Sequence, residues 1–212
     1  MTKFDIAKFS EPFTPVLAAT TLPIDVQGQE IFFDTYACQG DSENEQLLVL
    51  VHRDSSHPDD AVPLVRVHSG CVTGDIFHSL RCDCYEQLQS ALIEISAAPL
   101  GALVYLPYHE GRGIGLFKKL QAYALQDRSA DTVDANIEIG TPLDARDYSL
   151  TAGVLIALGM KKIRLLSNNP AKQKALADLG IYIVSRLPLA ATPSPYNRRY
   201  LETKRSRLAH EF

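Results

Sequence analysis

The chain has 212 residues, of which 46% are hydrophobic, and its formal net charge at pH 7 is −4. This length suits one sizeable domain or two small ones, and the mild negative charge argues against a generic nucleic-acid or membrane-surface binder. The sequence has no apolar run long enough to cross a membrane. Its first residues, MTKFDIAKFSEPFTP, lack the apolar core of a signal peptide, so we expect a cytoplasmic protein.

The first third of the chain predicts β-strands. We expect residues 1–20 to form an irregular lead-in. Residues 22–36 alternate loosely between apolar and polar positions around Gly28, which is typical of a β-hairpin. Short apolar segments predict two further strands, at 47–52 and 64–68.

From about Cys71 onward the pattern changes to alternating helices and strands. Helices are predicted after an N-cap at Asp83 and over residues 116–126, 148–158, 170–179 and 198–210. Strands are predicted over residues 101–106, 162–166 and 181–185. Residues 127–141 are predicted to be mostly loop. This alternation implies parallel strand pairing. The fold class is therefore mixed α/β: one domain over 21–205, β-rich at its start, with a tail at 206–212.

Three of the four cysteines, Cys71, Cys82 and Cys84, lie in the stretch RVHSGCVTGDIFHSLRCDCYEQ. In a reducing compartment, clustered cysteines are more often metal ligands than disulfide partners. Three thiolates suit Zn²⁺, and three protein ligands leave a coordination position open for water. Two alternatives stay open: a structural four-ligand site completed by His68 or His78, and buried thiols without a metal.

Two turns predict anion binding. In HEGRGIG, residues 109–115, glycines let the backbone approach a ligand and Arg112 can grip a phosphate; the alternative is a simple tight connection. In SNNPAK, residues 167–172, Asn169 can cap a helix that starts at Pro170. That cap would bring free amides and Lys172 to the carboxyl edge of the sheet, where α/β proteins bind ligands; the alternative is a capped surface helix.

The segment DARD contains Asp144, Arg146 and Asp147. Charged residues ahead of a helix are usually caps, which is how we interpret Asp147. The spacing assigns no function to Asp144 or Arg146. Tyr123 shares a helix face with Leu116 and Leu120, so periodicity places it in the core.

Taken together, these motifs resemble the GTP cyclohydrolase II family, which catalyses the first step of riboflavin biosynthesis. The pieces that carry the resemblance follow the family's order between Leu64 and Lys204: RVHSGCVTGD, SLRCDC, EGRGIGL, QAYALQD, DTVDAN, LLSNNPAK and YLETK. The resemblance implies zinc-dependent hydrolysis of GTP to 2,5-diamino-6-ribosylamino-4(3H)-pyrimidinone 5′-phosphate, formate and pyrophosphate. It also implies Mg²⁺ on the nucleotide and a homodimer.

The resemblance further implies a role for individual residues. Zinc would be held by Cys71, Cys82 and Cys84, and Tyr123 would assist opening of the imidazole ring. Arg146 would be the nucleophile toward the α-phosphate and Asp144 the proton acceptor; because a guanidinium is almost always protonated, an electrostatic role for Arg146 is an equal alternative. The implied nucleotide-binding set is Arg66, Val67, His68, Ser69, Gly70, Gln87, Glu110, Gly111, Arg112, Thr132, Ser167 and Lys172.

The sequence departs from the family pattern at three positions. Gly70 stands where an acidic residue is usual, Ser167 replaces a threonine, and Pro107 replaces an arginine. Two alternatives to the complete reaction therefore stay open: an enzyme that stops at the formylated intermediate, and a non-catalytic paralogue that only binds the nucleotide. Retention of Tyr123 argues against the first, and retention of the cysteines, Asp144 and Arg146 argues against the second.

Overall fold

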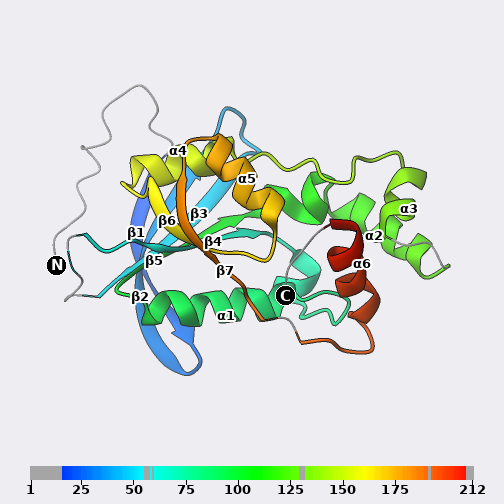
Figure 1. The fold of residues 1–212 in the computed structure, drawn as a ribbon, viewed down its shortest axis with the longest axis horizontal. Coiled ribbons are helices and arrows are strands. Elements are labelled where there is room, and N and C mark those ends of the chain that lie inside the picture. Colours follow the sequence, from blue (N-terminus) through cyan, green and yellow to red (C-terminus); the bar gives the residue numbers. More distant parts are fainter. Residues whose placement is uncertain (1–15, 55–57, 59, 129–131, 191, 209–212) are drawn as a thin grey trace.

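The computed structural model describes residues 16–54, 58, 60–128, 132–190 and 192–208, which form one mixed α/β domain around a seven-stranded sheet (Figure 1). The strands are β1 (Val16–Val26), β2 (Gln29–Gln39), β3 (Gln46–Arg53), β4 (Leu64–Ser69), β5 (Leu100–Leu106), β6 (Lys162–Leu166) and β7 (Tyr182–Leu187). The helices are α1 (Cys84–Ala97), α2 (Leu116–Gln126), α3 (Thr132–Glu138), α4 (Ser149–Ala157), α5 (Pro170–Asp178) and α6 (Arg198–Leu208). Two shorter helical turns, η2 (Val72–Ile76, a π-helical turn) and η3 (Pro107–Gly113, mostly 3₁₀), follow β4 and β5.

The sheet combines an antiparallel half and a parallel half, in the strand order β1-β2-β3-β5-β4-β6-β7. The predicted hairpin is confirmed as β1 and β2, joined at Gly28. β3 pairs antiparallel with both β2 and β5. β4 pairs parallel with β5 and with β6, and β6 pairs parallel with β7, as the alternating pattern predicted. The carboxyl ends of β4, β5 and β6 therefore meet at one edge of the sheet.

Each face of the sheet is covered by helices. α1 packs on one face, where Ala91, Leu92 and Ile95 join a buried cluster that includes Phe33 and Leu103. α4 and α5 cover the other face, where the larger cluster contains side chains such as Val154, Leu155 and Leu176. Figure 1 shows α2, α3 and α6 gathered at the end of the molecule away from the β1–β2 hairpin.

Three local predictions are corrected by the structure. The irregular lead-in is wrong for residues 16–20, because β1 begins at Val16 and pairs with β2; residues 1–15 lie outside the described part. The predicted loop 127–141 contains the helix α3, which packs against α2. Asp83 occupies the N-cap position of α1 but makes no capping bond, because its carboxylate is used elsewhere.

Other predictions are confirmed. The side chain of Asn169 accepts a hydrogen bond from the amide of Ala171 and caps α5. Asp147 accepts from the amide of Ser149, the first residue of α4. The terminal helix is α6, which is described as far as Leu208. The limits 21–205 for the catalytic domain stay a prediction. Among the described residues, no helix is both long and apolar enough to span a bilayer.

Candidate active site

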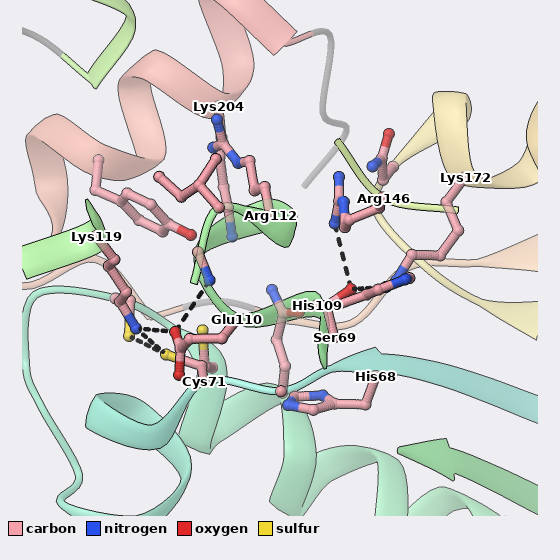
Figure 2. A pocket seen from close by; sticks show the side chains of 18 of the residues that line it. His68, Ser69, Cys71, His109, Glu110, Arg112, Lys119, Arg146, Lys172 and Lys204 are labelled. Carbon is pink, nitrogen blue, oxygen red and sulfur yellow. Dashed lines mark hydrogen bonds and ion pairs between the residues drawn. The ribbon is translucent and has the colours of Figure 1, made fainter. Parts of the chain in front are cut away.

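A cavity opens at the carboxyl edge of β4, β5 and β6, where the predicted site residues converge (Figure 2). Its walls come from segments that are far apart in the sequence: the end of β4, the loop 70–83 that carries two of the predicted metal ligands and leads to the third (the metal-ligand loop), η3, α2, the segment before α4, the start of α5, and α6. Parallel strands leave their connecting loops at this edge, and this arrangement lets distant motifs meet. The location is therefore the one that the SNNPAK and HEGRGIG motifs predicted.

The three predicted metal ligands are together at one end of the cavity. The sulfur atoms of Cys71, Cys82 and Cys84 lie within 4.8 Å of one another, and neither His68 nor His78 belongs to this group among the described residues. The Sγ atoms of Cys71 and Cys82 are 3.8 Å apart. Two sulfurs bound to Zn²⁺ at about 2.3 Å and at a tetrahedral angle would be about 3.8 Å apart, so the donor set fits zinc.

Gly74 makes this convergence possible. A Cβ added at Gly74 would lie 2.8 Å from Cβ of Cys84, 2.9 Å from Sγ of Cys82 and 3.1 Å from Sγ of Cys71. These distances are shorter than ordinary van der Waals contacts, so two sulfurs and the Cβ of Cys84 close around a position that only glycine leaves free. The π-helical turn η2, which contains Gly74, therefore packs directly against the thiol cluster.

A buried lysine joins the thiol cluster to the glycine-rich turn. Nζ of Lys119 donates to Sγ of Cys71 at 3.0 Å and to Oε1 of Glu110 at 2.7 Å, as the dashed lines of Figure 2 show. Hydrogen bonds from Cys82 and Cys84, together with the charge of Lys119, hold the pKa of the Cys71 thiol well below its usual range. Cys71 is therefore held as a thiolate, the form that binds metal.

Asp75 holds the metal-ligand loop from beneath. Its carboxylate accepts hydrogen bonds from Nε2 of His68 at 3.1 Å, from the Tyr105 hydroxyl at 3.0 Å and from the Cys71 amide at 2.9 Å. Glu110 adds a second tie, because its Oε2 accepts from the amide of Val72 at 2.6 Å. The backbone that carries Cys71 is thus fixed to both β4 and β5, which keeps the thiol oriented.

The HEGRGIG turn uses left-handed backbone conformations. Gly111, Arg112 and Gly113 have φ values of 60°, 64° and 87°. Glycine adopts this region freely, whereas a residue with a side chain such as Arg112 does so at a cost that is typical of functional sites. Nη1 of Arg112 is buried without a hydrogen-bond partner among the described residues, and the side chain lines the cavity.

Arg146 is held by a neighbouring carboxylate. Its Nε donates to Oδ1 of Asp144 at 2.8 Å and its Nη2 donates to Oδ2, so the pair is bidentate. Burial tends to raise the pKa of Asp144, but the hydrogen bonds and charge of Arg146 outweigh it and leave that pKa below its usual value. Burial tends to lower the pKa of Arg146, yet Asp144 leaves it raised, so the guanidinium stays protonated.

His109 is a site residue that the sequence reasoning did not single out. Its Nε2–H donates to the carbonyl of Asp147 at 2.8 Å, which leaves Nδ1 to accept from the Ser69 hydroxyl at 3.3 Å. Burial lowers the pKa of His109 to about 4, so the ring is neutral near pH 7. Ser69 in turn accepts from Nη1 of Arg146 at 3.4 Å, so His109 helps to orient that guanidinium.

Comparison with known proteins decides the family. The family model described as GTP cyclohydrolase II matches residues 16–188 of the chain. The chain belongs to the GTP cyclohydrolase II family. It is 53% identical over 148 residues to the riboflavin biosynthesis protein RibBA of Mycobacterium tuberculosis (strain ATCC 25618 / H37Rv), an alignment that covers 70% of this chain and 35% of the relative.

Two other relatives named RibBA give similar values. The protein of Mycobacteroides abscessus is 51% identical over 166 residues, which covers 77% of this chain and 40% of the relative. That of Salinispora arenicola is 47% identical over 178 residues, which covers 84% of this chain and 42% of the relative. This GTP cyclohydrolase II family chain thus spans less than half the length of the curated relatives it matches.

Most residues that the family resemblance implied meet at the cavity of this GTP cyclohydrolase II family member. Those that line it are Arg66, His68, Ser69, Gly70, Cys71, Cys82, Cys84, Gln87, Glu110, Gly111, Arg112, Tyr123, Arg146, Ser167 and Lys172. Val67 is different, because its side chain is fully buried in the core and its carbonyl accepts from Nζ of Lys172 at 2.6 Å. The side chain of Thr132, the first residue of α3, lies outside the described part.

Gly70 has a packing reason for its departure from the family pattern. A Cβ at this position would lie 3.0 Å from the carbonyl oxygen of Leu106 and 3.0 Å from Cα of Pro107. The Gly70 amide also donates to the Leu106 carbonyl at 2.8 Å. The ends of β4 and β5 approach so closely here that an acidic side chain would require the backbone to move.

The cavity also contains residues outside the predicted set. They are His109, Ile114, Lys119, Ala122, Gln126, Asn136, Asn168, Asn169, Tyr200 and Lys204. Lys119 could have been suspected, because it lies one helical turn before Tyr123 on the same face of α2. For Tyr200 and Lys204 the sequence offers only the family-like YLETK segment.

Proposed function

We propose that this chain hydrolyses GTP to 2,5-diamino-6-ribosylamino-4(3H)-pyrimidinone 5′-phosphate, formate and pyrophosphate, the first step of riboflavin biosynthesis. The observation that carries the proposal is the convergence of three thiols at one end of a cavity whose remaining wall is rich in cations. Membership of the GTP cyclohydrolase II family and the riboflavin-biosynthesis relatives support it.

The chain's own thiols fit one zinc ion per subunit. Cys71, Cys82 and Cys84 would hold it, as the sulfur separation and the space above Gly74 support. A zinc ion bound there would supply Lewis-acid activation of water for attack at C8 of the guanine ring. We expect Mg²⁺ to arrive with the nucleotide, since phosphate oxygens and water supply most ligands of that ion.

The cationic wall suits the triphosphate. Arg66 donates to the Leu166 carbonyl and to Gln87, Lys172 donates to the Val67 carbonyl, and Nη1 of Arg112 has no hydrogen-bond partner among the described residues. These three basic side chains therefore have no carboxylate bonded to them within the described part. They are available to an anionic ligand, and the guanidinium groups can bind phosphate oxygens in pairs.

We propose that Arg146 acts electrostatically at the α-phosphate. A nucleophilic guanidinium would first have to lose its proton, and the bidentate contact with Asp144 raises the pKa of Arg146 instead. The role of Asp144 is then to orient Arg146 and to keep it charged while negative charge develops on the phosphate.

Tyr123 is the proposed proton donor for opening of the imidazole ring. It lines the cavity on α2, one helical turn after Lys119, and the Arg81 guanidinium lies 4.4 Å from the centre of its ring. Burial raises the pKa of Tyr123 above its usual value, so the phenol stays protonated near neutral pH. A protonated phenol can donate to a ring nitrogen as the C8–N bond breaks.

Glu110 and Gln87 are the proposed contacts to the guanine edge. The carboxylate of Glu110 already accepts from Lys119, from the Gly111 amide and from the Val72 amide. A carboxylate has about four acceptor positions, so Glu110 retains one for guanine. The main role of Glu110 is then to hold the guanine base beside the metal-ligand loop, because the same carboxylate also joins that loop to η3.

We further propose a cytoplasmic homodimer with no nucleic-acid or membrane partner. Side chains at Ile76, Phe77 and Leu80 in the metal-ligand loop are 64%, 74% and 62% exposed, and apolar exposure of this size is typical of a contact surface. Size-exclusion chromatography with light scattering measures the mass; a monomer at micromolar concentration would contradict this assignment.

Product analysis tests the proposed function. Purified, zinc-loaded protein is incubated with GTP and Mg²⁺, and formate and pyrophosphate are quantified. Equal amounts of the two products support the complete reaction. Pyrophosphate without formate supports an enzyme that stops at the formylated intermediate, and the absence of both products supports a nucleotide-binding paralogue.

The Cys82→Ser variant should release no formate. Cys38→Ser, which changes a buried thiol outside the cluster, is the control. Undiminished formate from Cys82→Ser would reject the proposed role of the thiols.

A further inference from the structure

The C-terminal helix α6 forms one wall of the cavity, although the family model ends at residue 188. Tyr200 and Lys204 of α6 line the cavity together with residues of β4, η3 and α2. In Figure 1, α6 lies at the same end of the molecule as α2 and α3, and Figure 2 shows Lys204 and Arg112 among the side chains that line the cavity. Arg112 and Arg146 line the same cavity as these two residues of α6. α6 thus faces the part of the cavity where we place the phosphates.

A buried ion pair docks α6 onto the metal-ligand loop. Nζ of Lys204 donates to Oδ1 of Asp83 at 2.7 Å, and the two side chains are 10% and 0% exposed. Asp83 lies between the ligands Cys82 and Cys84 in the sequence. A buried carboxylate that loses its partner is strongly unfavourable, so Asp83 favours the docked position of α6.

The same carboxylate orients two proposed nucleotide-binding residues. Oδ2 of Asp83 accepts from Nε2 of Gln87 at 2.5 Å, and Oε1 of Gln87 accepts from Nη2 of Arg66 at 2.7 Å. Arg66 continues the chain by donating to the Leu166 carbonyl at the end of β6. A continuous line of buried hydrogen bonds therefore runs from Lys204 to the carboxyl edge of the sheet.

The described side chains of α6 offer little apolar packing. Among them, Leu201 is the buried apolar one, while Thr203 and Lys204 are buried polar residues. Within this described part, the docking of α6 therefore depends largely on the polar contacts of its inner face.

We propose that α6 is part of the nucleotide site: docked through the Lys204–Asp83 pair, it closes the cavity over the bound nucleotide. Lys204 is a positioning residue that acts through Asp83 on Gln87 and Arg66. Tyr200 forms a further part of the cavity wall. This inference rests on the proposed function, because it takes GTP as the ligand of the cavity. An α6 that merely covers the fold would leave nucleotide affinity independent of Lys204.

The test compares variants of the full-length chain by binding of guanosine 5′-[α,β-methylene]triphosphate. Lys204→Met removes the charge and keeps the length of the side chain, Lys204→Arg restores the charge, and Arg205→Met removes an exposed cation of the same helix as a control. We expect Lys204→Met to weaken binding about tenfold or more, as loss of one partner of a buried pair implies. Lys204→Arg should recover most of that loss, and Arg205→Met should stay within about twofold of the wild type.

Two further measurements separate the proposal from a purely structural role. Amide exchange across 198–208 should slow when the analogue binds to the wild type, and should be fast with or without analogue in Lys204→Met. The double variant Lys204→Met/Asp83→Asn should bind no worse than Lys204→Met alone, because it removes the unpaired carboxylate while the side-chain amide oxygen that replaces it can still accept from Gln87. Zinc content should stay at one ion per chain in Lys204→Met.

Several outcomes would overturn the proposal. One is that Lys204→Met binds the analogue as tightly as Arg205→Met does. Another is that amide exchange of α6 becomes faster in Lys204→Met while the affinity for the analogue stays unchanged. A third is that Lys204→Met loses zinc, which would mean that the Lys204–Asp83 pair supports the metal-ligand loop instead. Formate and pyrophosphate release by the wild type tests the proposed function separately. A wild type that binds the analogue and protects α6, but releases neither product, would contradict that function and leave the role of α6 intact.

Discussion

Gly74→Ala tests whether the thiol cluster is built to hold a metal ion. Gly74 does not have a positive φ, so alanine is acceptable to the backbone and only the added methyl group matters. That methyl group would lie 2.9 Å from Sγ of Cys82 and 3.1 Å from Sγ of Cys71. Ordinary contact begins near about 3.4 Å, so at least one sulfur must move by about 0.5 Å, more than the ~0.2 Å tolerance of a metal–ligand bond.

We expect Gly74→Ala to weaken zinc binding by about 10- to 100-fold, the range seen when the surroundings of metal ligands are disturbed. That loss corresponds to about 1.4–2.7 kcal/mol. Competition with a chromogenic chelator measures the affinity, and elemental analysis gives the zinc content per chain.

Gly40→Ala is the matched control, since its methyl group would meet the flexible carboxylate of Glu45, away from the cavity. Wild-type zinc affinity in Gly74→Ala would refute the reasoning, because it would mean that the sulfurs need not keep the positions described for them.

Three further predictions concern residues around the cavity. Tyr123→Phe should lower formate release by about 100-fold or more while pyrophosphate release persists, since only the proton donor is lost; product quantification checks this. Lys119→Met should reduce the free energy of unfolding by about 3 kcal/mol, because a buried partner of Glu110 is removed. Denaturant unfolding measures this change, with Lys118→Met, which alters an exposed lysine, as the control. Equal stabilities of the two variants would contradict the prediction. Burial, together with Arg66 and Arg146, holds the pKa of Lys172 well below its usual value, and a bound phosphate would raise it. Nucleotide binding should therefore be accompanied by uptake of a proton. The affinity should fall as the pH rises from the pKa of Lys172 in the free protein to its pKa in the complex. Calorimetry in buffers of different ionisation enthalpy should show proton uptake in the wild type and none in Lys172→Met.

Local sequence signals predicted most of the fold. The hairpin of β1 and β2, the strands of the parallel half and the cap at Asn169 all follow from apolar periodicity, turn residues and side-chain hydrogen bonding between near neighbours. The helix α3 was missed because DTVDANIE has no clear apolar period. It packs against α2, so its stability comes partly from a tertiary contact that the local pattern does not encode.

The candidate site divides in the same way. Cysteine clustering pointed to a metal site, and the glycine-rich and SNNPAK turns pointed to the edge of the sheet. The spacing of Asp144 and Arg146 assigned them no role; their bidentate contact and the link from Arg146 through Ser69 to His109 are seen only in the structure. Asp83 shows the opposite error, since a residue typical of a helix cap is instead a buried partner of Lys204.

By itself the sequence determined the kinds of element, the metal-binding residue types and the turns that favour anions, because each depends on residues close together in the chain. Only the tertiary structure decided that Lys119 donates a hydrogen bond to the thiol of Cys71, that Gly74 leaves room for the thiol cluster, and that α6 forms one wall of the cavity. These features join segments far apart in the sequence. They exist because parallel strands bring their connecting loops to one edge, and no local pattern records which loops will meet there.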